Sequence, residues 1–144
     1  MTPATSAATE ASTPRAVGKS TSSAGKIGVL LVNLGTPDGT SFVPMWRYLR
    51  EFLSDQRVIE LSKLRWYPIL YGIVLMTRPK SSGANYELIW NRERNESPLL
   101  TFTRAQQEKL AEALADLPGV TVDYAMRYGN PSTTSVVERL VAQG

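Results

Sequence analysis

The hydrophobic positions of the chain predict an order of strand, several helices, strand and helix. The first apolar run, 27–34, is interrupted only by Gly28 and Asn33 and is followed by the sequence GTPDG at 35–39. A short apolar run bounded by glycine and proline is typical of a strand buried on both faces of a parallel sheet. Ligands of open α/β sheets bind at the carboxyl ends of the strands, so we expect a site beside the turn at 35–39.

A helix is predicted at about 42–54, where apolar residues recur at spacings of three and four. Ser41 can act as its N-cap, and Pro44 falls in the first turn, where a missing N–H does no harm. The apolar stripe is made of Met45, Leu49, Phe52 and Leu53. Periodicity favours a stripe that faces the core.

The next run, Leu64–Met76, is almost wholly apolar but shorter than the ~20 residues needed to cross a bilayer. It is either a buried helix that begins near Pro68 or an amphipathic lip lying on a membrane surface. Pro79 disfavours helix in the residue before it, so we expect the helix to end there. A short separate helix at 81–90 and a polar linker at 91–96 are expected to follow.

A further helix is predicted from about Thr103 to Leu117, because Thr103 and Gln106 resemble a capping box. Its inward face would consist of Phe102, Ala105, Leu110, Ala113, Leu114 and Leu117. Alternating apolar residues predict a second strand at 120–126, followed by a turn at 127–131.

The last predicted element is a helix that begins near 132–135, with Gly144 in the place of a C′ glycine. Its apolar face would consist of Val136, Val137, Leu140 and Val141. Residues 26–144 are therefore expected to form one Rossmann-like α/β domain in which the two strands lie side by side. Two strands leave edges and faces that need cover, so we expect a sheet incomplete at its C-terminal side and a chain that is a fragment.

Composition matters mainly through what it leaves out. The chain has no cysteine and no histidine, which excludes disulfides, thiolate metal sites and imidazole acid–base chemistry from these residues. The net charge of +3 comes without an aromatic-and-basic RNA motif, so we expect no nucleic-acid partner. Residues 1–25 are rich in Ala, Ser and Thr and are expected to be a disordered leader, since a transit peptide would carry more arginine.

The turn at 35–39 allows two interpretations. It loosely resembles a phosphate-cradling loop, but Pro37 removes one N–H donor and the third glycine of the dinucleotide fingerprint is missing. The interpretation we favour is a tight strand-to-helix turn in which glycine adopts positive φ.

Arginine and tyrosine occur together at two places, as Arg78 with Tyr86 and as Arg127 with Tyr128. Arginine binds a carboxylate bidentately and tyrosine donates a hydroxyl, so these pairs suit a carboxylate on a flat aromatic ligand. Each could instead be a solvated surface residue, except that Arg127 ends a strand beside Gly35. The carboxylates show no spacing that would pair them and are interpreted as solvated: Asp55, Glu60, Glu87, Glu108, Glu112 and Glu138.

Five separated motifs, in their order along the chain, resemble the ferrochelatase family. They are Val32–Pro37 (VNLGTP), Tyr48–Asp55 (YLREFLSD), Arg78–Lys80 (RPK) with Tyr86, Ser97–Leu99 (SPL) and Arg127–Pro131 (RYGNP). The resemblance implies a chelatase-type half-domain whose partner half faces it across a porphyrin cleft. It also implies insertion of ferrous iron into protoporphyrin IX, a lyase activity that needs no further cofactor.

The resemblance implies porphyrin binding for eight residues, in three groups. Arg78, Tyr86 and Ser97 match positions on the propionate side, Arg127 and Tyr128 match the inner cleft, and Leu34, Leu53 and Val58 match positions near the metal face and the pocket wall. The run Leu64–Met76 matches the lip of the porphyrin cleft. This match favours an amphipathic lip with a peripheral membrane contact over a buried helix. The family's metal-handling histidine and acidic partner lie in the other half, so no catalytic residue and no metal ligand is assigned to this chain.

Three hypotheses follow. The first is the N-terminal part of a cytoplasmic ferrochelatase, inactive alone, which grips and bends the macrocycle while a base in the missing C-terminal half removes the pyrrole protons. The second is a non-catalytic porphyrin- or haem-binding module. The third, an unrelated nucleotide-binding domain, is disfavoured by the order of the motifs.

Overall fold

The protein is described by a computed structural model that covers residues 26–143. The expected leader at 1–25 and the expected C′ glycine Gly144 lie outside the described residues. The elements follow in the order β1 (Ile27–Thr36), α1 (Phe42–Ser54), α2 (Lys63–Ile69), the π-helix η1 (Leu70–Val74), α3 (Leu75–Ile89), α4 (Pro98–Ala113), β2 (Val120–Gly129) and α5 (Thr133–Ala142).

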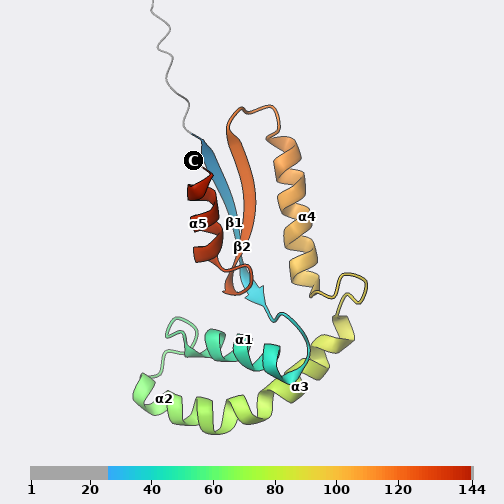
Figure 1. Cartoon of the computed structure of the whole chain (residues 1–144). Helices are drawn as coiled ribbons and strands as arrows, with labels where there is room; N and C mark the ends of the chain where they lie inside the picture. The colour runs from blue at the N-terminus through green and yellow to red at the C-terminus, as the bar shows by residue number, and fades with distance from the viewer. Residues whose placement is uncertain (1–25, 144) are drawn as a thin grey trace, which may run out of the picture.

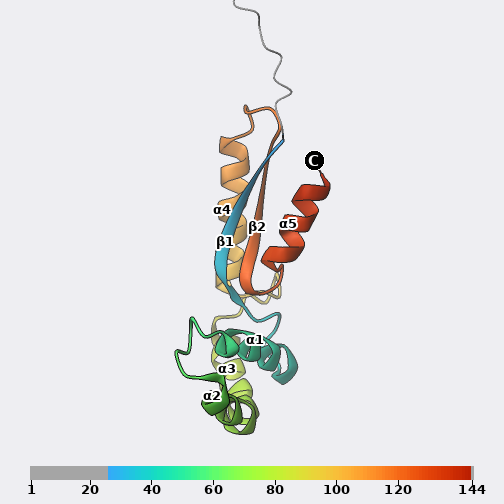
Figure 2. The ribbon, with the colours of Figure 1, turned by 90° about the vertical axis from the view of Figure 1, so that its left-hand side faces the viewer.

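The two strands form a parallel pair, as the sequence predicts. Their register runs from Ile27 opposite Val120 to Thr36 opposite Gly129. Figures 1 and 2 show α4 on one face of this pair and α5 on the other, while α1, α2 and α3 lie beyond the carboxyl ends of the strands. The α/β class and the strand order are therefore confirmed, and any ligand at the strand ends would lie between the sheet and the helices beyond it.

The expectation that β1 is buried on both faces is wrong for the described residues. Ile27, Val32 and Leu34 are all exposed. Helix α5 packs mainly on β2, and β2 pairs with only one edge of β1, so part of the β1 surface is left uncovered.

Helix α1 has the predicted bounds, but the helix after it does not end at Pro79. Helices α2, η1 and α3 follow one another without a break from Lys63 to Ile89, and Pro79 lies buried inside α3. Proline lacks the N–H that would bond the carbonyl four residues earlier. Here that carbonyl belongs to Leu75, at the boundary where the hydrogen-bonding pattern changes from π to α, so the missing bond falls where the ladder is already altered.

The apolar run Leu64–Met76 is amphipathic rather than wholly buried. Leu70 and Leu75 are buried, while several large apolar side chains are exposed: Leu64, Ile69, Tyr71, Ile73 and Met76. No helix within residues 26–143 is long and apolar enough to cross a membrane.

Helix α4 begins earlier than predicted. Ser97 is its N-cap and accepts a hydrogen bond from the N–H of Leu100 at 3.2 Å, so the capping box expected at Thr103 is wrong. Thr103 lies buried within the helix, and its hydroxyl donates to the carbonyl of Leu99 at 2.7 Å. The helix ends at Ala113, short of the predicted end at Leu117.

The predicted inward face of α4 is also partly wrong. Phe102, Ala113 and Leu117 are exposed, whereas two polar residues face the sheet. The amide of Asn33 in β1 donates to the Thr103 hydroxyl at 2.9 Å, and the amide of Gln107 donates to the carbonyl of Val122 in β2 at 2.9 Å. Hydrophobic periodicity cannot identify a sheet-facing stripe that bonds through polar side chains.

The last strand and helix are close to their predicted positions. Strand β2 extends through Arg127 to Gly129, so the predicted turn begins three residues later than expected. Helix α5 begins after Ser132, whose hydroxyl accepts from the N–H of Ser135 at 3.2 Å. Val136 is fully buried on its inner face, while Val137 and Val141 are exposed.

Candidate functional site

Helix α1 lies against the carboxyl end of β2, and side chains one helical turn apart make the connection. Glu51 accepts a hydrogen bond from the N–H of Gly129 at 3.0 Å. Asp55 Oδ2 accepts from Arg127 Nη2 at 3.1 Å and from Tyr128 Oη at 3.0 Å. Residues four apart on a helix share a face, so a single face of α1 fixes the end of the strand.

Behind these contacts lies an aromatic cluster. Met45, Tyr48 and Tyr128 are buried at its centre. The Phe52 ring stacks on Tyr48 with centroids 5.9 Å apart and meets Tyr128 edge-on at 5.2 Å. Val58, Leu49 and Tyr86 pack around this centre. The structure therefore brings together three of the predicted site residues: Val58, Tyr86 and Tyr128.

The glycine turn after β1 joins the same cluster. Gly35 has φ of 119°, and a Cβ built on it would lie 1.9 Å from the carbonyl oxygen of Tyr128. This confirms the reading of the turn in which glycine supplies positive φ. The hydroxyl of Tyr48 donates to the Gly35 carbonyl at 3.3 Å, and burial, together with the neighbouring Tyr86, raises the pKa of Tyr48.

The sequence-based expectation that Asp55 is a solvated carboxylate is wrong. Only 21% of its side chain is exposed, and both oxygens accept hydrogen bonds, because Oδ1 takes the N–H of Arg57 at 2.9 Å. The Arg57 N–H, the Tyr128 hydroxyl and the Arg127 guanidinium lower the pKa of Asp55 to about 2. Its place in the motif 48–55, four residues after Glu51, is the only sequence signal that could have identified it.

Arg127 stands at the rim of this cluster. Its side chain is 46% exposed, and its guanidinium carbon lies 5.6 Å from the centre of the Tyr128 ring. The Tyr128 hydroxyl and the Asp55 carboxylate raise the pKa of Arg127, so the guanidinium keeps its charge. Only Nη2 bonds Asp55, which leaves other guanidinium N–H groups to reach a ligand.

The other predicted site residues have different surroundings. Leu34 at the end of β1 is 53% exposed, and Leu53 is partly buried, with its carbonyl accepting from Trp66 Nε1 at 2.7 Å. Arg78 is exposed on α3. Ser97 is 1% exposed and caps α4. Arg78 and Ser97 are not among the residues that pack in the aromatic cluster.

Two hollows lie beside the strand ends. The smaller, about 300 Å³, is lined by Glu51, Ser54, Asp55, Arg127 and Tyr128. The larger, about 640 Å³, opens between α1 and the turns after both strands and shares Glu51 and Ser54 with the first. It also contains Trp46, Arg47, Arg50 and Tyr71. Aromatic surface beside charges of both signs can hold a flat ligand with carboxylate groups.

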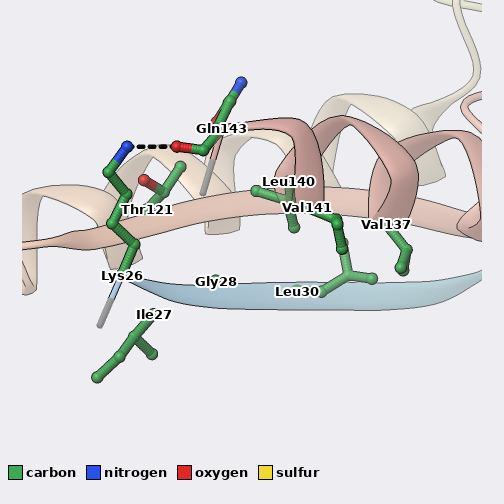
Figure 3. A pocket seen from close by; sticks show the side chains of 9 residues that line it. All are labelled: Lys26, Ile27, Gly28, Leu30, Thr121, Val137, Leu140, Val141 and Gln143. Carbon is green, nitrogen blue, oxygen red and sulfur yellow. Dashed lines mark hydrogen bonds between the residues drawn. The ribbon is translucent and has the colours of Figure 1, made fainter.

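A third hollow, of about 440 Å³, lies at the opposite end of the strands. Figure 3 shows it between β1 and α5, with Leu30, Leu140 and Val141 directed into the space between them. Lys26 Nζ donates to the carbonyl of Gln143 at its end. The lining is mostly aliphatic, and its polar members are Lys26, Thr121 and Gln143. Within residues 26–143, no three His, Cys, Asp or Glu side chains are grouped so that they could hold a metal.

Comparison with known proteins places the chain in a family. The family profile described as Ferrochelatase matches residues 26–144. A ferrochelatase of Mesorhizobium japonicum is 80% identical over 127 residues, which are 88% of this chain and 36% of that protein. Ferrochelatases of Brucella anthropi and Brucella ovis are 73% and 71% identical over 119 residues, which are 83% of this chain and 34% of each relative.

The chain thus spans about a third of the length of the curated relatives it matches. No solved structure matched it. The match of the family profile nevertheless covers every described element, from β1 to α5. The chain belongs to the ferrochelatase family.

Proposed function

We propose that this chain supplies the porphyrin-binding part of a ferrochelatase, a lyase that inserts ferrous iron into protoporphyrin IX to form protohaem. The observation that carries the proposal is the family match over residues 26–144. The site geometry supports it, because an aromatic cluster with a charged rim lies at the carboxyl ends of both strands, where α/β sheets bind ligands.

In this proposal Leu34, Arg127 and Tyr128 line the inner part of the cleft. The exposed side chain of Leu34 offers an apolar contact and cannot ligate iron, while Arg127 offers a fixed charge beside the Tyr128 ring. Contacts of this kind grip the macrocycle at its edge and face. Binding energy gained there can be used to bend the ring, so that the pyrrole nitrogens become accessible to the metal.

The propionate groups of the porphyrin are assigned to Arg78, Tyr86 and Ser97. Arg78 is exposed and can bind a carboxylate bidentately. The Ser97 hydroxyl accepts a hydrogen bond as an N-cap but still has a proton to donate. Tyr86 packs against the cluster that contains Tyr128, which connects this group to the inner cleft.

The amphipathic run Leu64–Met76 is assigned to a lip of the cleft. Its exposed apolar side chains and the ring pair Tyr67–Tyr71, with centroids 5.7 Å apart, suit both a porphyrin face and a membrane surface. We propose a cytoplasmic protein that contacts the membrane peripherally through this lip.

Deprotonation of the porphyrin is not assigned to a residue of this chain. The sequence has no histidine, the residue that most often accepts protons near neutral pH. The matched relatives are about three times as long as the matched stretch. We assign the base and the opposite wall of the cleft to a further portion like the remainder of those relatives.

A chimera tests the proposal. Residues 26–144 would replace the matching stretch of the Mesorhizobium japonicum ferrochelatase, and iron insertion would be followed by the loss of protoporphyrin fluorescence. We expect activity, and an Arg78→Ala chimera is expected to require more porphyrin for half-maximal rate. A folded chimera that binds protoporphyrin IX but inserts no iron would favour the non-catalytic binding module instead.

A further inference from the structure

Neighbouring residues Arg127 and Tyr128 contact the same oxygen of Asp55, although they follow each other in a strand. Successive side chains of a β-strand point to opposite faces. Both nevertheless reach Asp55 Oδ2, at 3.1 and 3.0 Å. The Arg127 guanidinium also lies 5.6 Å from the centre of the Tyr128 ring. Asp55 is the group on which the two side chains converge.

The carboxylate itself is well fixed. Asp55 is the C-cap residue that follows Ser54 at the end of α1, and its Oδ1 is held by the N–H of Arg57 at 2.9 Å. One turn earlier, Glu51 binds the N–H of Gly129, which holds the strand end against the helix. These contacts within the protein, which involve no ligand, fix Asp55 Oδ2 at the end of α1 so that it faces β2.

The two side chains differ in how much they depend on this contact. Tyr128 is buried, and its ring packs edge-on against Phe52, so packing alone fixes much of its position. Arg127 is about half exposed, and its closest contacts within the described site are the Asp55 carboxylate and the Tyr128 ring. Without Asp55, the long arginine side chain would be free to turn away from Tyr128 into solvent.

We infer that Asp55 is a positioning residue, which holds Arg127 and the Tyr128 hydroxyl on the porphyrin-facing side of β2. The inference rests on the proposed function and adds to it a residue that need not touch the porphyrin. Asp55 acts through Arg127, whose other guanidinium N–H groups stay available to the ligand.

Asp55→Asn is the informative variant, because it keeps the size of the side chain and an oxygen for the Arg57 N–H. If the single amide oxygen keeps the Arg57 N–H, an NH2 group takes the place of Oδ2, and an NH2 group cannot accept from Arg127 or Tyr128. Asp123→Asn is the matched control, because Asp123 lies on β2, the strand that carries Arg127. Asp123 pairs with Arg139 at 2.5 Å, and the exposed fractions of that pair, 21% and 51%, are close to the 21% and 46% of Asp55 and Arg127.

Two measurements separate positioning from stability, one on the whole chain and one on the chimera with the Mesorhizobium japonicum ferrochelatase. The first is the NMR order of the arginine Nε–H groups. Asp55→Asn is expected to lower the order of Arg127 and leave Arg139 unchanged, and Asp123→Asn should do the reverse. The second is the affinity of that chimera for protoporphyrin IX, read from the Soret band. Asp55→Asn is expected to weaken it roughly tenfold and Asp123→Asn to leave it unchanged.

Arg127 that stays ordered in the Asp55→Asn protein would overturn the inference. An Asp55→Asn protein with unchanged porphyrin affinity would also overturn it. So would equal losses of affinity in Asp55→Asn and Asp123→Asn, since equal losses would assign the effect to stability. A chimera without either change that gives no Soret shift would overturn the proposed function instead, and the Arg127 signal of the chain would still decide whether Asp55 holds this side chain.

Discussion

Gly83 of α3 packs directly against the carbonyl oxygen of Thr40, in the segment between β1 and α1. A Cβ built on Gly83 would lie 2.1 Å from that oxygen. The Thr40 hydroxyl also donates to Glu87, one turn further along α3, at 2.5 Å. These contacts hold α3, and with it Arg78 and Tyr86, against the turn at the end of β1. Glu87, for which the sequence predicts a solvated side chain, therefore has a structural contact.

Gly83→Ala should destabilise the protein. The new methyl group meets backbone rather than a flexible side chain, so either α3 or the segment at Thr40 must move, at a cost of about 1–3 kcal/mol. The free energy of unfolding measured with urea checks this. Gly72→Ala in η1 is the matched control, because a Cβ there meets nothing within 4 Å. Equal stability of the two variants would contradict the close packing of α3 on Thr40.

The sequence predicts the element types well where the hydrophobic pattern is strong and local. The α1 helix, the parallel pairing of the strands and the start of α5 all follow from periodicity and capping residues. The features that the sequence predicts wrongly depend on neighbouring elements of the fold. Pro79 is tolerated because a π-helix precedes it, and α4 faces the sheet partly through Thr103 and Gln107.

The candidate site also contains features that depend on three-dimensional packing and cannot be predicted from local sequence. Arg127 and Tyr128 can be selected from sequence because they end a strand beside a glycine turn. Asp55 cannot, because its two partners lie 72 and 73 residues away and only the packing of α1 across the strand end brings them together. Ser97 shows the converse, since the family resemblance assigns it to porphyrin binding, whereas the structure shows that it caps α4.

Three serines at helix starts should respond differently to alanine. Ser97 and Ser132 each accept a hydrogen bond from a backbone N–H at 3.2 Å, whereas the Ser41 side chain makes no such bond. Ser97→Ala and Ser132→Ala should each lower the free energy of unfolding by about 1 kcal/mol, and Ser41→Ala by less. Denaturant midpoints measure the effect.

A further variant, Ser97→Asp, separates capping from porphyrin binding at Ser97. Ser97→Asp keeps a capping oxygen but loses the hydroxyl proton, so it should retain stability and weaken protoporphyrin IX binding if Ser97 donates to a propionate. Ser132→Ala should leave porphyrin binding unchanged. Normal porphyrin affinity in Ser97→Asp would limit the role of Ser97 to the helix.

Thr103→Val tests the polar contact between α4 and β1. Thr103 is buried, and its hydroxyl accepts from Asn33 and donates to Leu99. Valine keeps the shape but leaves the Asn33 amide without this acceptor, at a cost of about 1–3 kcal/mol. Unfolding in urea measures the loss. The double variant with Asn33→Leu should lose less than the sum of the single changes, and strict additivity would show that the two side chains do not interact.

The stability that Asp55 contributes should depend on acidic pH. Its pKa is lowered in the folded protein to about 2 by the Arg57 N–H, the Tyr128 hydroxyl and Arg127, so the folded state favours the ionised carboxylate. The contribution is therefore fully present above the pKa of the unfolded chain, about 3.9, and is lost as pH falls toward 2. Urea midpoints of the unmodified and Asp55→Asn proteins, measured from pH 5 downward, isolate it. The gap between them should be constant above about pH 4 and close as the pH approaches 2. Two curves that stay parallel through this range would show that folding does not shift the pKa of Asp55.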